Sequence, residues 1–197
     1  VFLLAHLGDV GYNLPMKLSE QEKTQTWIIG VSGGSDSMAL LHMCMNAHMH
    51  IVVAHMNYQK RESAHRDTQG VKDFCHKHHI PFELRYQKEP CHENFQAFAR
   101  KQRYVFYREL IQAYDAAGVL IAHQLDDHLE TYLIQRERNA IPDFYGLQDH
   151  ITIFGCLVVR PLLAYTKAQL EAYCHHHHVP YYLDESNLSD QYTRNRI

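Results

Sequence analysis

The stretch Ile28–Ser37 constrains the fold of this chain more than any other part of the sequence. Its apolar, β-prone start, Ile28–Val31, runs into the loop Ser32-Gly33-Gly34, and a helix-type pattern begins at once behind it. Glycines let a backbone approach an anion closely, and the unpaired N–H groups and dipole of a helix start favour negative charge. The stretch therefore predicts a strand, a phosphate-binding loop and a helix N-terminus in succession.

The side chains of this loop refine the prediction. Ser35 and Ser37 add hydroxyl donors, whereas Asp36 would repel a phosphate unless a divalent cation lies between the two groups. Neither a Walker A Gly-Lys-Ser/Thr nor a Rossmann Gly-x-Gly-x-x-Gly accompanies the loop. The alternative interpretation is an ordinary Gly/Ser turn between a strand and a helix.

Composition limits the classes of protein to which the chain can belong. Its 197 residues, 46% hydrophobic and 21% charged, are enough for one globular domain with a sizeable core. We expect this domain at residues 26–197, behind an N-terminal extension of unclear role at 1–25. The net charge of −3 excludes a bulk polyanion binder, so contacts with nucleic acid would have to come from local patches.

The five cysteines are scattered and form no Cys-x-x-Cys pair, which argues against a disulfide framework, an iron–sulfur cluster or a zinc ribbon. No apolar run approaches transmembrane length. We therefore expect a cytoplasmic protein with no membrane partner. The run His175–His178 is typical of a metal-binding tract, but it ends a predicted helix, where cationic side chains also suit the helix dipole.

Strand-like and helix-like segments alternate along the chain, and this pattern predicts an α/β fold built on a parallel sheet. The predicted strands are Trp27–Val31, Ile51–Ala54, Pro81–Arg85, Val119–Ala122 and Leu157–Val159. The predicted helices are Ser37–Asn46, His65–His79, a helix capped by Asn94 that runs to Tyr114, Asp126–Gln135 and Thr166–His177.

Polar residues follow the ends of four of these strands. They are Ser32–Ser37, His55, His123 and Arg160. Because ligands bind beyond the carboxyl ends of the strands in open sheets of this kind, we expect these residues to line one cleft.

An acidic segment, His123–Thr131, directly follows the fourth predicted strand. Residues 123, 127 and 130 are spaced at i, i+4 and i+7, which predicts that they lie close to one face of a helix. Asp126 and Glu130 form a like-charged i, i+4 pair, which is destabilising unless a cation lies nearby. Two interpretations stay open: the carboxylates bind a metal ion or an amine, or they only suit the helix dipole.

The loop Ser32–Ser37 resembles the PP-loop, Ser-Gly-Gly-x-Asp-Ser, of the ATP pyrophosphatase superfamily. With His-x-x-Asp-Asp-x-x-Glu-Thr at 123–131, the chain resembles the catalytic domain of the tRNA(Ile)-lysidine synthases. Further agreement comes from Asn94–Tyr104, Arg160–Leu163, Asp184–Asn187 and Arg194–Ile197. The resemblance implies a Rossmann-like parallel sheet of the adenine nucleotide alpha hydrolase type, with helices on both faces.

The family so resembled joins L-lysine to the wobble cytidine of the tRNA(Ile) that carries a CAU anticodon. ATP adenylates the carbonyl oxygen of the pyrimidine ring, and the lysine amine then displaces AMP. The resemblance therefore implies ATP and Mg²⁺ as cofactors and this tRNA and L-lysine as partners, and it leaves a homodimer open.

The resemblance also implies roles for individual residues. The nucleotide and its phosphates would be held by Ser32, Gly33, Gly34, Ser35, Asp36, Ser37, His55 and His123. The Mg²⁺ ligands would be Asp36 and Asp127. The catalytic residues would be Asp36, Asp126, Asp127, Glu130 and Arg196. Lysine or tRNA would be bound by Arg61, Arg100, Arg103, Arg160, Asp184, Asn187, Arg194 and Asn195.

Two segments depart from the family pattern. His55–Arg61 reads His-Met-Asn-Tyr-Gln-Lys-Arg in place of His-Val-Asn-His-Gly-Leu-Arg. Arg138-Asn139-Ala140 stands where the family has an Arg-Gly-Ser-Gly loop, and the loss of two glycines changes the backbone shapes that this loop permits.

Two alternatives to the lysidine synthase function stay open. The chain could be another PP-loop tRNA-modifying enzyme or amidotransferase, or a non-catalytic relative that binds nucleotide or tRNA.

Overall fold

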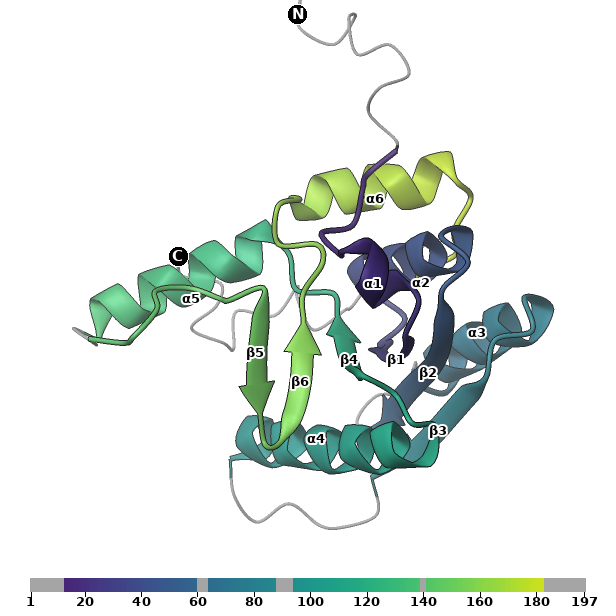
Figure 1. Cartoon of the computed structure of the whole chain (residues 1–197), viewed down its shortest axis with the longest axis horizontal. Coiled ribbons are helices and arrows are strands. Elements are labelled where there is room, and N and C mark those ends of the chain that lie inside the picture. The colour runs from purple at the N-terminus through teal and green to yellow at the C-terminus, as the bar shows by residue number, and fades with distance from the viewer. Residues whose placement is uncertain (1–12, 60–63, 88–93, 139–140, 183–197) are drawn as a thin grey trace, which may run out of the picture.

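One six-stranded sheet forms the centre of the structure (Figure 1). The computed structural model describes residues 13–59, 64–87, 94–138 and 141–182. The strands are β1 (Thr26–Gly30), β2 (His50–Asn57), β3 (Phe82–Tyr86), β4 (Gly118–Ile121), β5 (His150–Ile153) and β6 (Cys156–Val159). Their order is β3-β2-β1-β4-β6-β5, and the neighbouring strands run parallel except for the β5–β6 pair.

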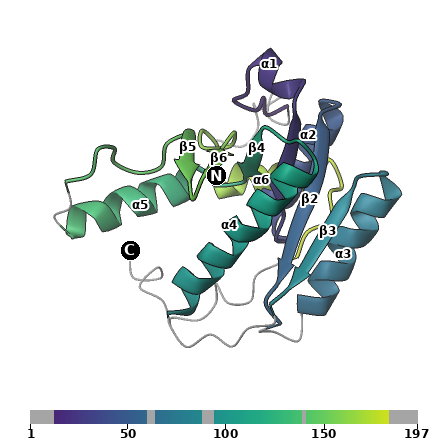
Figure 2. The ribbon, with the colours of Figure 1, turned by 60° about the horizontal axis from the view of Figure 1, so that its bottom comes forward.

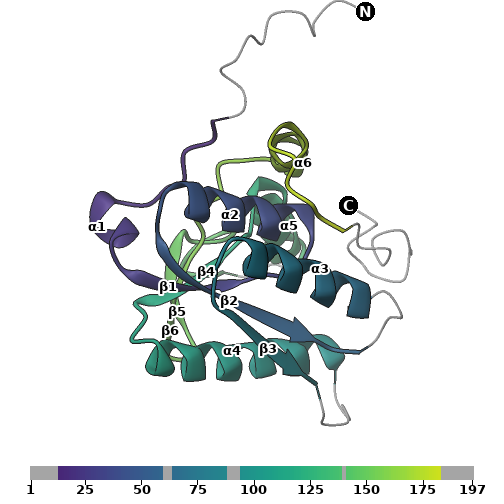
Figure 3. The same ribbon diagram turned by 90° about the vertical axis from the view of Figure 1, so that its right-hand side faces the viewer.

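Helices cover both faces of this sheet, as the sequence predicts. They are α1 (Glu20–Lys23), α2 (Ser35–Asn46), α3 (Ala64–Lys77), α4 (Phe95–Ala113), α5 (Leu125–Glu137) and α6 (Lys167–His176). Figure 3 shows α2, α3 and α6 on one side of the sheet and α4 on the other. Helix α5 projects away from the sheet, beside β5 (Figure 1 and Figure 2). The α/β class with a mostly parallel sheet is therefore confirmed.

The alternation of side chains along β1 creates two hydrophobic cores. Successive residues of a strand point to opposite faces of its sheet. Trp27 and Ile29 belong to the core shared with α2, α3 and α6, whereas Ile28 belongs to the core shared with α4. All three side chains are fully buried, as expected for a strand covered on both faces.

Two features of the sheet differ from the prediction. Strand β5 was not predicted. It forms a hairpin with β6 through a two-residue turn, and the turn residues Phe154 and Gly155 have φ of 49° and 79°. The turn lacks the usual Asn-Gly, and four residues of β-prone sequence are a weak signal for a strand. Strand β2 extends to Asn57, so His55 lies inside the strand and not behind its end.

The residues before β1 pack against the domain. Leu14, Met16 and Leu18 contact the core that contains α2 and α6. Helix α1 is short, and the capping box between Ser19 and Glu22 holds its first turn. In the described part of the chain, no helix combines the length and apolar character needed to span a membrane.

Candidate active site

The loop Ser32–Gly34 leads from β1 into the first turn of α2. Its last residue, the N-cap Gly34, is extended and provides no side-chain acceptor to the helix. Three other helices of the described chain have an N-cap side chain that accepts a backbone N–H of the helix. These N-caps are Asn94, Gln124 and Thr166. Because helix N-termini carry unpaired N–H groups and a positive dipole end, an anion suits the start of α2.

The hydroxyl of Ser37 holds this loop in shape. Its Oγ donates to the carbonyl of Gly34 at 3.0 Å and accepts from the N–H groups of Ser32 at 3.2 Å and Gly33 at 3.3 Å. Gly33 has a φ of +97°, a conformation that L side chains rarely adopt. The serine and glycine types at these positions are thus needed for the backbone path itself.

Three charged side chains, one from α5 and two from α6, come within electrostatic range of Asp36 beside the loop. Burial raises the pKa of the Asp36 carboxyl, and the nearby carboxylates of Asp127 and Glu171 add to this rise. The ammonium of Lys167 and a hydrogen bond from Ser35 oppose it. The structure therefore places Asp127 within electrostatic range of Asp36, and it adds Lys167 and Glu171 of α6, which the sequence did not predict.

Asp126 and Asp127 also stabilise helix ends. Asp127 Oδ2 accepts from the backbone N–H of Gln124 at 3.1 Å, and the side-chain oxygen of Gln124 accepts from the N–H of Asp126 at 2.6 Å. Asp126 Oδ2 accepts from the N–H of Lys167, the first residue of α6, at 3.0 Å. The helix-dipole interpretation therefore accounts for part of this acidic segment, and the two interpretations are compatible.

His123 does not lie on the face of α5. It precedes the N-cap Gln124, so the expectation that residues 123, 127 and 130 share a helical face is wrong for His123. Instead, its Nδ1 accepts from Nε of Arg160 at 3.0 Å. Arg160 is only 3% exposed, burial lowers the pKa of its guanidinium, and it also donates to the carbonyl of Gln148. In this geometry, Arg160 orients His123.

His55 supports the loop from inside β2. The ring is 3% exposed, and burial lowers its pKa. Its Nδ1 lies 2.8 Å from the carbonyl oxygen of Val31, and its Nε2 lies 2.9 Å from Oγ1 of Thr68. Since both ring nitrogens have protein partners, His55 fixes the residue that precedes the loop.

The remaining predicted residues are more dispersed. Glu130 is half-buried on α5, one turn beyond Asp126. Arg100 and Arg103 are exposed on α4, and the Arg100 guanidinium lies over the ring of Tyr104, 5.8 Å from its centroid. Outside the described residues lie Arg61, Asp184, Asn187, Arg194, Asn195 and Arg196.

A family model described as a PP-loop domain matches residues 12–197, which is nearly the whole chain. The chain belongs to the PP-loop family. This match agrees with the strand, Gly/Ser loop and helix seen at the carboxyl end of β1, and it begins within the segment that we treated as an N-terminal extension.

Individual relatives give a more specific comparison than the family model does. A tRNA(Ile)-lysidine synthase of Ureaplasma parvum is 41% identical over 177 residues, which are 87% of this chain and 53% of that protein. A tRNA(Ile)-lysidine synthase of Mesomycoplasma hyopneumoniae is 34% identical over 186 residues, 93% of this chain and 61% of that protein. The PP-loop chain thus spans between half and two thirds of the length of these relatives.

Among solved structures, the fold is similar to that of the tRNA thiolase NcsA from Methanococcus maripaludis. The TM-score is 0.71 at 12% sequence identity, and the match covers 88% of this chain and 64% of that chain. At this identity, the likeness supports the PP-loop fold alone.

Within the PP-loop site, Asp36 and Asp127 are two carboxylates in electrostatic range of each other that could hold a cation. Over residues 13–59, 64–87, 94–138 and 141–182, no group of three or more His, Cys, Asp or Glu side chains is arranged to hold a metal ion. Mg²⁺ is often bound by one or two carboxylates together with phosphate oxygens. The pair therefore fits a cation that arrives with a phosphate.

Sequence reasoning missed the contribution of α6 and of the residues behind it. Lys167 and Glu171 act on Asp36, and the N–H of Tyr182 donates to the carbonyl of Gly33 at 2.9 Å. No local pattern marks these residues, because only the packing of α6 against α2 brings them to the loop.

Proposed function

We propose that this chain is the adenylating domain of a tRNA(Ile)-lysidine synthase. It would use Mg²⁺ and ATP to adenylate the wobble cytidine of a tRNA(Ile) with a CAU anticodon and would then join L-lysine to that cytidine. The observation that carries the proposal is the intact PP-loop beside the Asp36–Asp127 pair, in a chain 41% identical to a protein of that name.

The first step needs a site that holds triphosphate and stabilises the leaving pyrophosphate. The cytidine carbonyl oxygen would attack the α-phosphorus, and the bond between the α- and β-phosphates would break. The first turn of α2 supplies N–H groups for the phosphates, while Ser37 holds the N–H groups of Ser32 and Gly33 in the loop. Mg²⁺ held by Asp36 and Asp127 would offset the repulsion between phosphate and the buried carboxylate.

The second step needs a neutral amine next to the adenylated base. The lysine nitrogen would form a bond to the ring carbon, AMP would leave, and a proton would pass from the amine to a base. Asp126 and Glu130, one turn apart on α5, are carboxylates able to bind the ammonium and accept that proton. AMP is a far better leaving group than the oxygen that it activates, which is why ATP is consumed.

A surface beside α5 is suited to RNA. Aromatic side chains that are 36–45% exposed lie along it, and exposed arginines follow at the end of the helix. These residues are Tyr132, Phe144, Tyr145, Arg136 and Arg138. Exposed aromatic rings stack on unpaired bases, and guanidinium groups pair with phosphates, so this surface fits an anticodon loop despite the net charge of −3.

The described cysteines argue against a thiol-based tRNA modification. Cys44, Cys75, Cys156 and Cys174 are all buried and free. Burial raises the pKa of the Cys75 and Cys174 thiols to about 12, so neither is a ready nucleophile. Within the described residues, these thiols favour the ligase over a thiolase, and they suit the reducing cytoplasm.

The proposal is tested with Mg²⁺–ATP, radiolabelled lysine and tRNA(Ile) bearing a CAU anticodon. We expect label on the tRNA, release of one pyrophosphate per label, and loss of both in Asp36→Asn. Asp143→Asn, an exposed aspartate of the 141–149 loop, is the matched control and should keep both signals.

Other results of this assay would change the assignment. Pyrophosphate release without label would retain adenylation and indicate a different nucleophile. The absence of both signals, in a sample shown to be folded, would contradict the proposal and indicate a binding-only protein.

A further inference from the structure

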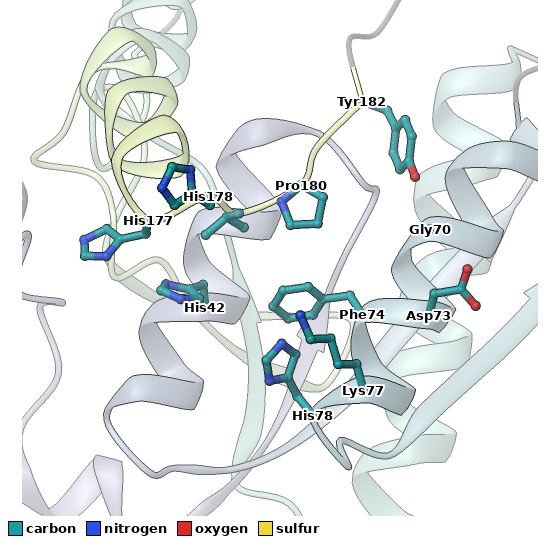
Figure 4. A pocket seen from close by; sticks show the side chains of 11 residues that line it. His42, Gly70, Asp73, Phe74, Lys77, His78, His177, His178, Pro180 and Tyr182 are labelled. Atoms are coloured by element: carbon teal, nitrogen blue, oxygen red, sulfur yellow. The ribbon is translucent and has the colours of Figure 1, made fainter.

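A cavity lies between the C-terminal half of α2, helix α3 and the residues that follow α6 (Figure 4). Its volume is about 470 Å³. None of the predicted nucleotide-binding residues lines it, and the lining residue Tyr182 connects it to the PP-loop through the bond from its N–H to Gly33. We call it the histidine pocket, because imidazole rings from three parts of the chain face it.

The histidine pocket gathers side chains that can carry a positive charge. These are His42 of α2, Lys77 and His78 at the end of α3, and His177 and His178 behind α6. One carboxylate, Asp73, lies among the lining residues, and its Oδ1 already accepts from Gln69 Nε2 at 2.7 Å. The phenol of Tyr182 completes the polar lining at the far end (Figure 4).

The imidazoles of the pocket are close enough to oppose one another's protonation. The rings of His42 and His177 lie 5.4 Å apart between centroids. Burial lowers the pKa of His42, and the neighbouring His177 and His78 lower it further. The hydroxyl of Tyr173, 2.9 Å from Nδ1 of His42, belongs to a phenol whose pKa burial raises to about 12, so it stays uncharged.

The chemistry of this lining selects an anion over a metal ion. In the portion of the chain that the structure describes, no set of three ligating side chains has a metal-binding arrangement. An anion of several oxygens, in contrast, would offset the mutual repulsion of protonated imidazoles and accept hydrogen bonds from them and from Lys77. Phe74, Val179 and Pro180 add an apolar wall against which an organic group can pack.

We propose that the histidine pocket binds the phosphate group of a small molecule, either inorganic pyrophosphate or a mononucleotide, and binds it more tightly as the pH falls. The sign follows from linkage. An anion favours the protonated imidazoles, so binding takes up protons, and affinity rises as the pH falls toward the pKa of His42, which burial holds below its ordinary value.

The test follows His42 by NMR of its ring nitrogens, with the signal assigned from His42→Gln. The whole protein is titrated with pH in the absence and presence of inorganic pyrophosphate, and separately with AMP. We expect a bound ligand to raise the pKa of His42, and we expect calorimetric affinity to be several-fold higher at about pH 6 than at about pH 8. A response to pyrophosphate or to both indicates a simple phosphate site, and a response to AMP alone indicates a nucleotide site.

The variant Lys77→Gln/His78→Gln should abolish the shift. Lys72→Gln/His76→Gln is its matched control, since it removes the same two side-chain types from exposed positions of α3. The PP-loop can itself bind these probes, so the His42 signal, and not the total heat, decides the outcome. An unshifted His42, or equal effects of the two double variants, would overturn the proposal.

Discussion

At the scale of single residues, two adjacent glycines of the PP-loop have different requirements. Gly33 has a φ of +97°, and a Cβ there would lie 3.4 Å from Val71. Gly34 has a φ of −75°, and a Cβ there would make only an ordinary contact with Ser32 Oγ at 3.7 Å. We expect Gly33→Ala to lower the free energy of unfolding by about 1–3 kcal/mol. Gly34→Ala should stay near wild type. Urea unfolding measures both, and equal losses would contradict this account.

The buried carboxyl of Asp36 is expected to lower the stability of the folded protein while it serves the site. Its pKa is raised above 3.8 by burial, so the folded state holds the proton more tightly than the unfolded chain. The ionised carboxylate therefore costs stability above the folded pKa and none below about pH 3.8. In urea without divalent cations, we expect Asp36→Asn to unfold later than wild type at pH 7.

This gain should disappear as the pH falls through the raised pKa and below the ordinary one. Asp143→Asn, whose carboxylate is exposed, serves as the control and should show no comparable gain at pH 7. A variant Asp36→Asn that is less stable than wild type at pH 7 would show that the carboxylate is well paired in the folded protein.

Some residues of the site could be predicted from the local sequence, and others could not. Ser37 and Gly33 were predictable, because the backbone path of one short loop demands them. The bond between Arg160 and His123 was not, since it joins residues 37 positions apart that only the strand order makes neighbours. Arg160 is expected to bind lysine or tRNA, and in this structure its Nε donates to His123.

At the scale of elements, Gly70 leaves a notch in the surface of α3, and Tyr182 from the segment behind α6 occupies this notch. A Cβ on Gly70 would lie 2.0 Å from the hydroxyl of Tyr182, and the N–H of Tyr182 donates to Gly33 of the PP-loop. We expect Gly70→Ala to destabilise the protein, although alanine in a helix interior is otherwise favoured over glycine by about 1 kcal/mol. In a Tyr182→Ala background, the same change should become stabilising.

This double-mutant cycle, measured by urea unfolding, separates the notch from helix propensity. Equal effects of Gly70→Ala in both backgrounds would show that Tyr182 does not occupy the notch. The cycle also reports on the PP-loop, because displacement of Tyr182 should weaken nucleotide binding along with stability.

Helix α6 depends on α5 for its first turn. Asp126 accepts the N–H of Lys167, so Asp126→Ala should cost about 1 kcal/mol of stability. Asp126→Asn keeps an acceptor oxygen and should retain most of that stability. If the charge of Asp126 binds the lysine ammonium, the asparagine variant should raise the KM for lysine several-fold. An unchanged KM would limit Asp126 to its capping role.

The elements themselves were predictable where the pattern was strong. The cap at Asn94 and the long helix behind it were expected, and the structure has α4 at Phe95–Ala113. Strand β5 was missed because its four residues alternate between exposed and half-buried and its turn carries Phe154 in a left-handed conformation. Such a strand is stabilised by its pairing with β6, and no local pattern in the sequence predicts that pairing.

At the scale of the whole molecule, α5 is a long helix that the core secures only weakly. None of its 13 residues is buried, whereas α2 has eight buried residues. It is held by a short run of contacts with the 144–147 segment, including the N–H of Gly146 donating to Gln135 at 2.7 Å and the paired rings of Tyr132 and Tyr145. Its exposed apolar side chains include Leu129 and Leu133.

Amide hydrogen exchange should therefore separate the two helices. Local opening is easiest where few apolar contacts must break, so we expect the amides of α5 to exchange much faster than those of α2 in the free protein. If the surface beside α5 receives the anticodon loop, tRNA(Ile) with a CAU anticodon should slow exchange in α5. Mg²⁺–ATP alone should slow exchange at the start of α2 and not in α5. Protection of α5 by nucleotide without tRNA would mean that this helix closes on ATP and does not form the RNA surface.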